Sequence, residues 1–155
     1  MATFKDYLEN NSLLILHGAL GTEMEALGYD ISGKLWSAKY LLEKSEVIQE
    51  LHETYVAAGA DLITTSSYQA TLPGLVEAGL TEKAAEQIIA LTVRLAKAAR
   101  DKVWGALDET EKAKRPYPLI SGDVGPYAAY LANGSEYSGD SVSYTHLRAH
   151  ETDQY

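Results

Sequence analysis

The sequence predicts an α/β fold built on a parallel sheet, and two observations support this. Three short apolar runs that suit buried strands, at residues 13–16, 60–65 and 119–120, alternate with longer segments of helical periodicity. Each run ends in small and polar residues, where parallel strands of α/β proteins lead into ligand sites. Such alternation is typical of right-handed βαβ units, so we expect three strands side by side in one sheet.

The first strand, LLIL at residues 13–16, is expected to lead into a short helix. Gly18 ends the apolar run. Thr22 and Glu25 have the spacing of a capping box, which predicts that this helix covers residues 22–27.

A second helix is predicted over residues 46–58, because Ser45 is a good N-cap and Gly59 a good C-terminal stop. The residues expected on its apolar face are Val47, Ile48, Leu51, Tyr55 and Ala58. His52 lies beside this face, so we expect it at the boundary with solvent rather than as a ligand. The strand at residues 60–65 follows directly.

A longer helix is predicted from Thr81 to about Trp104, because apolar residues recur at helical spacing and charged residues fall opposite them. The charged stretch at residues 107–118 can extend this helix until Pro116 ends it. The third strand is expected near Leu119.

Composition and charge exclude several classes of function. The 155 residues, 46% of them hydrophobic, suit one globular domain. A formal net charge of -9 repels phosphate backbones and anionic lipids, so neither nucleic acid nor a membrane is an expected partner. No apolar run approaches the ~20 residues of a membrane span, and the N-terminus lacks a secretory pattern, so we expect a cytoplasmic location. The chain contains no cysteine, and therefore no thiolate metal ligand.

No single motif of the sequence identifies a reaction, but four stretches taken together, in their order and spacing, are informative. In chain order they are ILHGALGTEMEALGYD, LWSAKYLL, ELHETYVAAGADLITTSSYQAT and GDVGPYAAYLANGSEYSGD. Together they resemble the N-terminal part of the homocysteine S-methyltransferase family, over roughly residues 10–140. The last stretch is most similar to the branch that uses S-methylmethionine as methyl donor. On this resemblance, residues 1–140 form the N-terminal part of a homocysteine-binding methyltransferase barrel.

The resemblance implies about three βα units of a (β/α)8 TIM barrel, which is incomplete here because a whole barrel takes about 250 residues. It implies methyl transfer from S-methylmethionine or S-adenosylmethionine to homocysteine, which forms methionine. In the family, zinc held by three cysteine thiolates binds the homocysteine sulfur as a thiolate. Because this chain has no cysteine, we expect the zinc ligands beyond it. We also expect no zinc on this chain, an inactive fragment, and self-association through uncovered strands.

The resemblance also places substrate-binding residues at the ends of the three strands. They are His17, Gly18, Thr65, Ser66, Ser67, Tyr68, Gly125 and Pro126. His17 stands where the family usually has an aspartate that is thought to hold the amino-acid substrate. An imidazole can contact a carboxylate, but it does not pair with an ammonium group as aspartate does. Asp123 stands where the family more often has a small residue such as serine. No catalytic residue is expected within this chain.

Two other functions remain open from the sequence. The chain can be read as a small, self-sufficient α/β module that binds a ligand at its strand ends without catalysis. A weaker hypothesis is a nucleotide-binding domain, in which Gly18 and Gly21 present backbone N–H groups to a phosphate. The spacing is GxxG rather than GxGxxG, which favours a simple tight turn.

The last stretch, residues 141–155, contains the most metal-like cluster of the chain. His146 and His150 are four residues apart and Glu151 is adjacent, which is a spacing compatible with a metal site on a helix. However, the family resemblance stops at about residue 141, and SVSYTHLRAHETDQY has neither a helix cap nor an apolar stripe. It resembles translated sequencing-adaptor read-through. We therefore interpret this segment as a non-native, disordered tail and exclude its histidines from the site.

Overall fold

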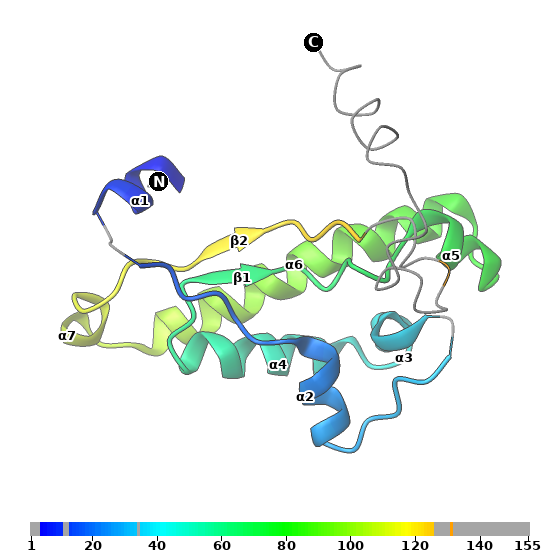
Figure 1. The fold of residues 1–155 in the computed structure, drawn as a ribbon, viewed down its shortest axis with the longest axis horizontal. Coiled ribbons are helices and arrows are strands. Elements are labelled where there is room, and N and C mark those ends of the chain that lie inside the picture. The colour runs from blue at the N-terminus through cyan, green and yellow to red at the C-terminus, as the bar shows by residue number, and fades with distance from the viewer. Residues whose placement is uncertain (1–3, 11–12, 34, 126–130, 132–155) are drawn as a thin grey trace, which may run out of the picture.

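Two parallel strands form the sheet in the computed structural model, which describes residues 4–10, 13–33, 35–125 and 131, and a third parallel segment joins it by a single bridge (Figure 1). β1 (Leu62–Thr64) pairs in parallel with β2 (Leu119–Ser121). On the other edge of β1, Leu16 forms a parallel bridge to Leu62, next to a 3.1 Å hydrogen bond from the His17 N–H to the Leu62 carbonyl. The first predicted strand is therefore confirmed in place and direction, but it pairs only as an isolated bridge.

Helices connect these segments in the predicted alternation. In chain order they are α1 (Phe4–Asn10), α2 (Leu20–Ala26), the 3-10 helix η1 (Trp36–Ala38), α3 (Lys39–Glu43), α4 (Ser45–Ala57), α5 (Leu72–Glu77), α6 (Glu82–Ala106) and α7 (Glu109–Lys112). Figure 1 shows α4 and α6 side by side on one side of the strands, where α4 contacts β1 and α6 contacts β2. No described helix is long and apolar enough to span a bilayer.

The predicted start of α6 is confirmed, whereas the predicted capping box of α2 is wrong. The Thr81 side chain accepts a hydrogen bond from the Ala84 N–H, as expected of an N-cap. α2 instead begins at Leu20, and its N-cap residue Ala19 makes no side-chain cap. The first segment stays paired with β1 as far as His17, so the chain turns into α2 as soon as that pairing ends.

The extension of α6 through the charged stretch is also wrong, because α6 ends at Ala106. The separate helix α7 follows, and its N-cap Asp108 accepts hydrogen bonds from the backbone N–H groups of Thr110 and Glu111. This capping box, in the sequence DETE, stabilises the start of a new helix after α6 has ended. The short helix α5 was not predicted.

The core forms two clusters: the larger one lies among α2, α3, α4, α5 and α6, and the smaller one lies between α4, α6 and the strands. The side chains that α4 buries are Val47, Ile48, Leu51, His52 and Val56. Ala58, expected on the apolar face, is exposed, and His52, expected at a boundary, has no exposed surface. The His17 ring packs edge-on against His52, with 5.9 Å between ring centroids, and contributes to its burial. The periodicity of α4 alone does not show that a side chain of the first strand segment packs against His52.

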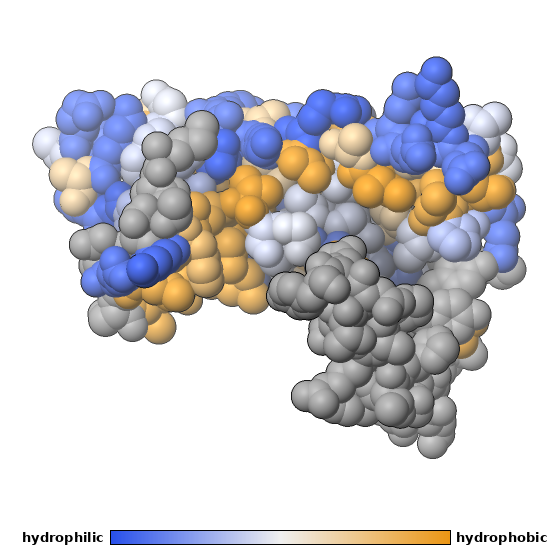
Figure 2. Space-filling model, turned by 90° about the horizontal axis from the view of Figure 1, so that it is seen from above, coloured by the Kyte–Doolittle hydropathy of each residue, from blue (hydrophilic) through white to orange (hydrophobic). Residues whose placement is uncertain are grey.

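The outer edge of the sheet exposes apolar side chains. Leu13 is 72% exposed and Leu16 57% exposed. Figure 2, which looks down on the strands, shows hydrophobic side chains gathered there. An uncovered sheet edge with apolar side chains is a template for pairing with another chain.

We therefore expect the 155-residue chain to self-associate, and Leu13→Lys to reduce this, because a charged side chain on an edge opposes pairing. Light scattering after size exclusion at several protein concentrations measures the effect. Leu27→Lys, at an exposed leucine of the turn after α2, changes charge and apolar area in the same way and serves as the matched control. A monomeric parent chain across the whole concentration range contradicts the prediction.

Candidate functional site

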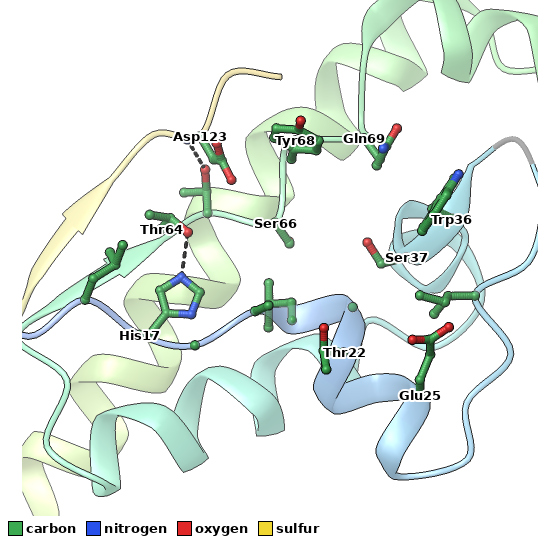
Figure 3. Close-up of a pocket in the computed structure, with 17 residues that line it drawn as sticks. His17, Thr22, Glu25, Trp36, Ser37, Thr64, Ser66, Tyr68, Gln69 and Asp123 are labelled. Carbon is green, nitrogen blue, oxygen red and sulfur yellow. Dashed lines mark hydrogen bonds between the residues drawn. The ribbon is translucent and has the colours of Figure 1, made fainter. Parts of the chain in front are cut away.

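A cavity of about 600 Å³ opens at the carboxyl ends of the three parallel segments (Figure 3). Its walls come from residues 16–22 of the first segment and the start of α2, from residues 64–66, 68 and 69 at the end of β1 and after it, and from Asp123 after β2. Glu25 of α2, Ile31, and Trp36 and Ser37 of η1 complete the lining. A cavity therefore lies where the sequence places the site, at the ends of the strands, and ligand binding there stays a prediction.

Gly18 allows the first segment to pass close to α4. A Cβ at this position would lie 2.8 Å from Cε1 of Tyr55, closer than side-chain carbons approach. The Tyr55 hydroxyl donates to the Ala19 carbonyl at 3.2 Å, which fixes the turn into α2. His17 is thereby held at the end of the segment with its imidazole in the cavity, where Nε2 lies 2.5 Å from Oγ1 of Thr64 (Figure 3).

Two hydroxyl groups after β1 hold the segment that follows β2. Thr65 Oγ1 and Ser67 Oγ are 2.7 Å apart. The Asp123 N–H donates to Thr65 Oγ1 at 3.0 Å, and Ser67 Oγ donates to the Asp123 carbonyl at 2.5 Å. Both backbone groups of Asp123 are therefore fixed by the neighbouring strand end.

Gly125 brings the same two segments into direct backbone contact. A Cβ on Gly125 would lie 2.3 Å from the carbonyl oxygen of Tyr68, a distance that real Cβ atoms do not show. Only a glycine fits here without a backbone movement. The loop after β1 and the end of β2 thus form one wall of the cavity.

The His17 ring, which is half-buried at the cavity, packs against the fully buried ring of His52. His17 also packs on Tyr55, with 5.2 Å between ring centroids. His17 Nδ1 and both ring nitrogens of His52 are buried without a hydrogen-bond partner among the described residues. Burial lowers the pKa of His17, against the opposing effects of the Gly18 backbone and of Asp123. Burial and, to a smaller extent, the neighbouring His17 lower the pKa of His52 to about 4. Both rings are therefore neutral at pH 7.

The cavity carries negative charge. Among the described lining residues, the charged side chains are the carboxylates of Glu25 and Asp123. Burial raises the pKa of Asp123, and the nearby His17 opposes that rise. Because His17 is neutral, this lining favours a cationic group of a ligand over an anionic one.

The structure brings together most of the residues predicted for the site. His17, Gly18, Thr65, Ser66 and Tyr68 line the cavity. Two others support its wall from behind, since Ser67 bonds to Asp123 and Gly125 packs on the Tyr68 backbone. Pro126 and the tail cluster of His146, His150 and Glu151 lie outside the described residues. What each of these residues binds remains a prediction.

Sequence reasoning left several lining residues out of the site, among them Thr64, Asp123 and Trp36. Thr64 and Asp123 could have been found, because they stand at the end of β1 and directly after β2. Trp36 gives no such signal. Its φ of 46° is left-handed, which is rare for a bulky side chain and costs conformational energy. That conformation places the indole at the cavity from a segment without strand or helix periodicity.

The described residues do not fit a zinc ion. No group of three or more His, Asp or Glu side chains comes together in the described part of the chain. The sequence contains no cysteine, the ligand that the resemblance implies. His17 and His52 do not supply a site between them, because His17 Nε2 is engaged with Thr64 and His52 lies closed off from the cavity.

Comparison with known proteins gives one consistent family. The model of the homocysteine S-methyltransferase family matches residues 14–154. The match reaches into the segment that we interpret as a non-native tail. A curated homocysteine S-methyltransferase of Bacillus subtilis is 44% identical over 140 residues, which is 90% of this chain and 44% of the relative. That of Escherichia coli is 44% identical over 133 residues, 86% of this chain and 41% of the relative.

A solved structure agrees with these sequence matches. The crystal structure of the homocysteine methyltransferase MmuM from Escherichia coli, in its metallated form, superposes with a TM-score of 0.73 at 42% identity. The superposition covers 91% of this chain and 47% of that one. The chain thus shares the fold of part of that enzyme, and it spans less than half the length of the relatives that it matches.

Proposed function

Because the chain belongs to the homocysteine S-methyltransferase family, we propose that the whole protein transfers a methyl group from a sulfonium donor to homocysteine. The product is methionine, and the donor is S-methylmethionine or S-adenosylmethionine. The observation that carries the proposal is the match of the family model over residues 14–154. The solved relative, named a homocysteine methyltransferase, supports it.

The cavity is consistent with this chemistry. Homocysteine carries an ammonium group and the donor carries a sulfonium, so both substrates bring a positive charge to a lining whose charged residues are Glu25 and Asp123. In the reaction, the homocysteine sulfur loses its proton to water and, as the thiolate, forms a bond to the methyl carbon while the bond from that carbon to the donor sulfur breaks. The donor leaves as a neutral thioether. The described residues bind and orient, and none of them is proposed as a catalytic acid or base.

We further propose that the complete protein is a (β/α)8 barrel of which this chain forms about three βα units. The three parallel segments, with α4 and α6 on one side, support this. Zinc dependence is proposed for the complete protein only, supported by the metallated form of the relative. The residues of this chain do not fit the ion, so we assign them no step that involves it. The cytoplasmic location remains a prediction from the sequence.

The proposal is tested by restoring the remainder of the protein. A chimera that joins residues 1–125 to the corresponding remainder of the Escherichia coli relative is expected to form methionine from homocysteine and S-methylmethionine. The 155-residue chain alone is expected to form none and to contain no stoichiometric zinc, by metal analysis. A folded chimera without activity contradicts the proposed function. Turnover by the chain alone contradicts the interpretation that it is an inactive part.

A further inference from the structure

The inference concerns how the cavity holds the amino-acid substrate, and it therefore rests on the proposed function. An α-amino acid enters as a zwitterion, and its ammonium group loses water when it is enclosed. That loss is offset when an ionised oxygen accepts its hydrogen bonds. The charged side chains that line the cavity in the described part of the chain are Glu25 and Asp123. The partner of the ammonium group is thus expected to be one of these two.

His17 is not suited to that task. Its Nε2 lies against Thr64 Oγ1 and its Nδ1 is buried. A neutral imidazole offers an ammonium group no negative charge, and a protonated one repels it. The position at the end of the first segment is therefore without an anionic group in this chain.

Of the two carboxylates, Asp123 is the one held in a fixed place. Its backbone N–H and carbonyl are bonded to Thr65 and Ser67, and the next turn is locked by the contact of Gly125 with the Tyr68 carbonyl. These bonds use the backbone of Asp123, so its carboxylate is available to a ligand. Figure 3 shows Asp123 beyond Thr64 from His17, at the strand-end side of the cavity.

Glu25 differs from Asp123 in its exposure and in its position at the cavity. It is exposed on α2, on the side of the cavity away from the strand ends (Figure 3). An exposed carboxylate on a long side chain gains little from an ion pair, because water screens the charge and the side chain must be ordered. The Asp123 carboxylate is half-buried on a fixed backbone, so water screens its charge less and less side-chain ordering is needed on binding.

We infer that Asp123 is the carboxylate that receives the α-ammonium group of the amino-acid substrate. It is a specificity-determining residue rather than a catalytic one, since it selects amino acids over thiols that lack the amino group. In this chain the anionic partner thus comes from the end of β2 and not from the end of the first segment.

The experiment compares two ligands that differ only in the amino group, L-homocysteine and 4-mercaptobutanoic acid. NMR titration of the 155-residue chain gives both dissociation constants. The parent chain is expected to prefer homocysteine by about tenfold or more, the range of one charge-assisted hydrogen bond. In Asp123→Asn the preference is expected to disappear while the affinity for 4-mercaptobutanoic acid persists. That persisting affinity separates the loss of a contact from the loss of the fold.

Glu86→Gln removes one negative charge at an exposed position on α6 and is the charge-matched control, with the preference expected to stay. Two results overturn the inference alone: an unchanged preference in Asp123→Asn, or a preference lost in Glu25→Gln instead. If the parent chain binds neither thiol, the inference fails, whereas the proposed function of the whole protein is decided separately by the activity of the chimera.

Discussion

Gly125→Ala should destabilise the chain by about 1–3 kcal/mol or more and abolish binding of homocysteine, because the added methyl group has no space. Its carbon would lie 2.3 Å from the carbonyl oxygen of Tyr68, and a backbone oxygen cannot move aside as a flexible side chain can. The contact is relieved only if the end of β2 moves away from the loop after β1. Such a movement also breaks the bonds from Thr65 and Ser67 to Asp123. Urea denaturation measures the stability and NMR titration the binding.

Gly122→Ala is the matched control for this substitution. It lies three residues earlier on the same segment, and a Cβ there meets no atom within 4 Å. We expect a change of a few tenths of a kcal/mol in either direction, since the methyl group only restricts the unfolded chain. Equal stability of the two variants would show that the segment after β2 is not packed against Tyr68 as described.

The second large effect is a loss of stability in mild acid that originates at His52. This side chain has no exposed surface, and its pKa lies at about 4 in the folded chain against 6.5 for the free side chain. Above pH 6.5 the ring is neutral in both states, so it contributes no pH dependence. Between pH 6.5 and about 4 the unfolded chain binds a proton that the folded chain does not. The free energy of unfolding therefore falls with pH over this window, by about 3 kcal/mol in total.

His52→Leu tests this assignment. The variant lacks the titrating ring, so the difference in unfolding free energy between parent and variant should change by about 3 kcal/mol from pH 7 to pH 4. His17, whose pKa is also lowered, remains in both proteins and cancels to first order. At pH 7 we expect the variant to be at least as stable as the parent, because two buried nitrogens without described partners are removed. A pH-independent difference would contradict the burial of a neutral His52.

The elements that could be predicted from the sequence are those whose signal is local. The runs near Ile63 and Ile120 are apolar and bounded by polar residues, so β1 and β2 were found. α6 was found because its periodicity extends over six turns and Thr81 caps it. The location of the cavity could also be predicted from the sequence, because the carboxyl ends of parallel strands meet at one edge of the sheet.

The features that could not be predicted depend on contacts between distant segments. His52 packs against a ring that lies 35 positions earlier in the chain, whereas the helix pattern alone places it at a boundary. Asp123 is fixed by Thr65 and Ser67, for which no spacing rule exists. The left-handed conformation of Trp36 is contrary to the preference of its residue type.

The hydroxyl bonds from Thr65 and Ser67 to Asp123 also bear on the order of folding. They join residues separated by 58 and 56 positions, and the whole of α6 lies between them. Closing so long a loop has an entropic cost that local helix formation does not have, so this wall of the cavity is expected to form late. A ligand that needs the finished wall then binds only after β2 has docked, and its binding opposes the release of β2. Amide hydrogen exchange in β2 should accordingly slow when homocysteine is present, while exchange within α6 stays the same.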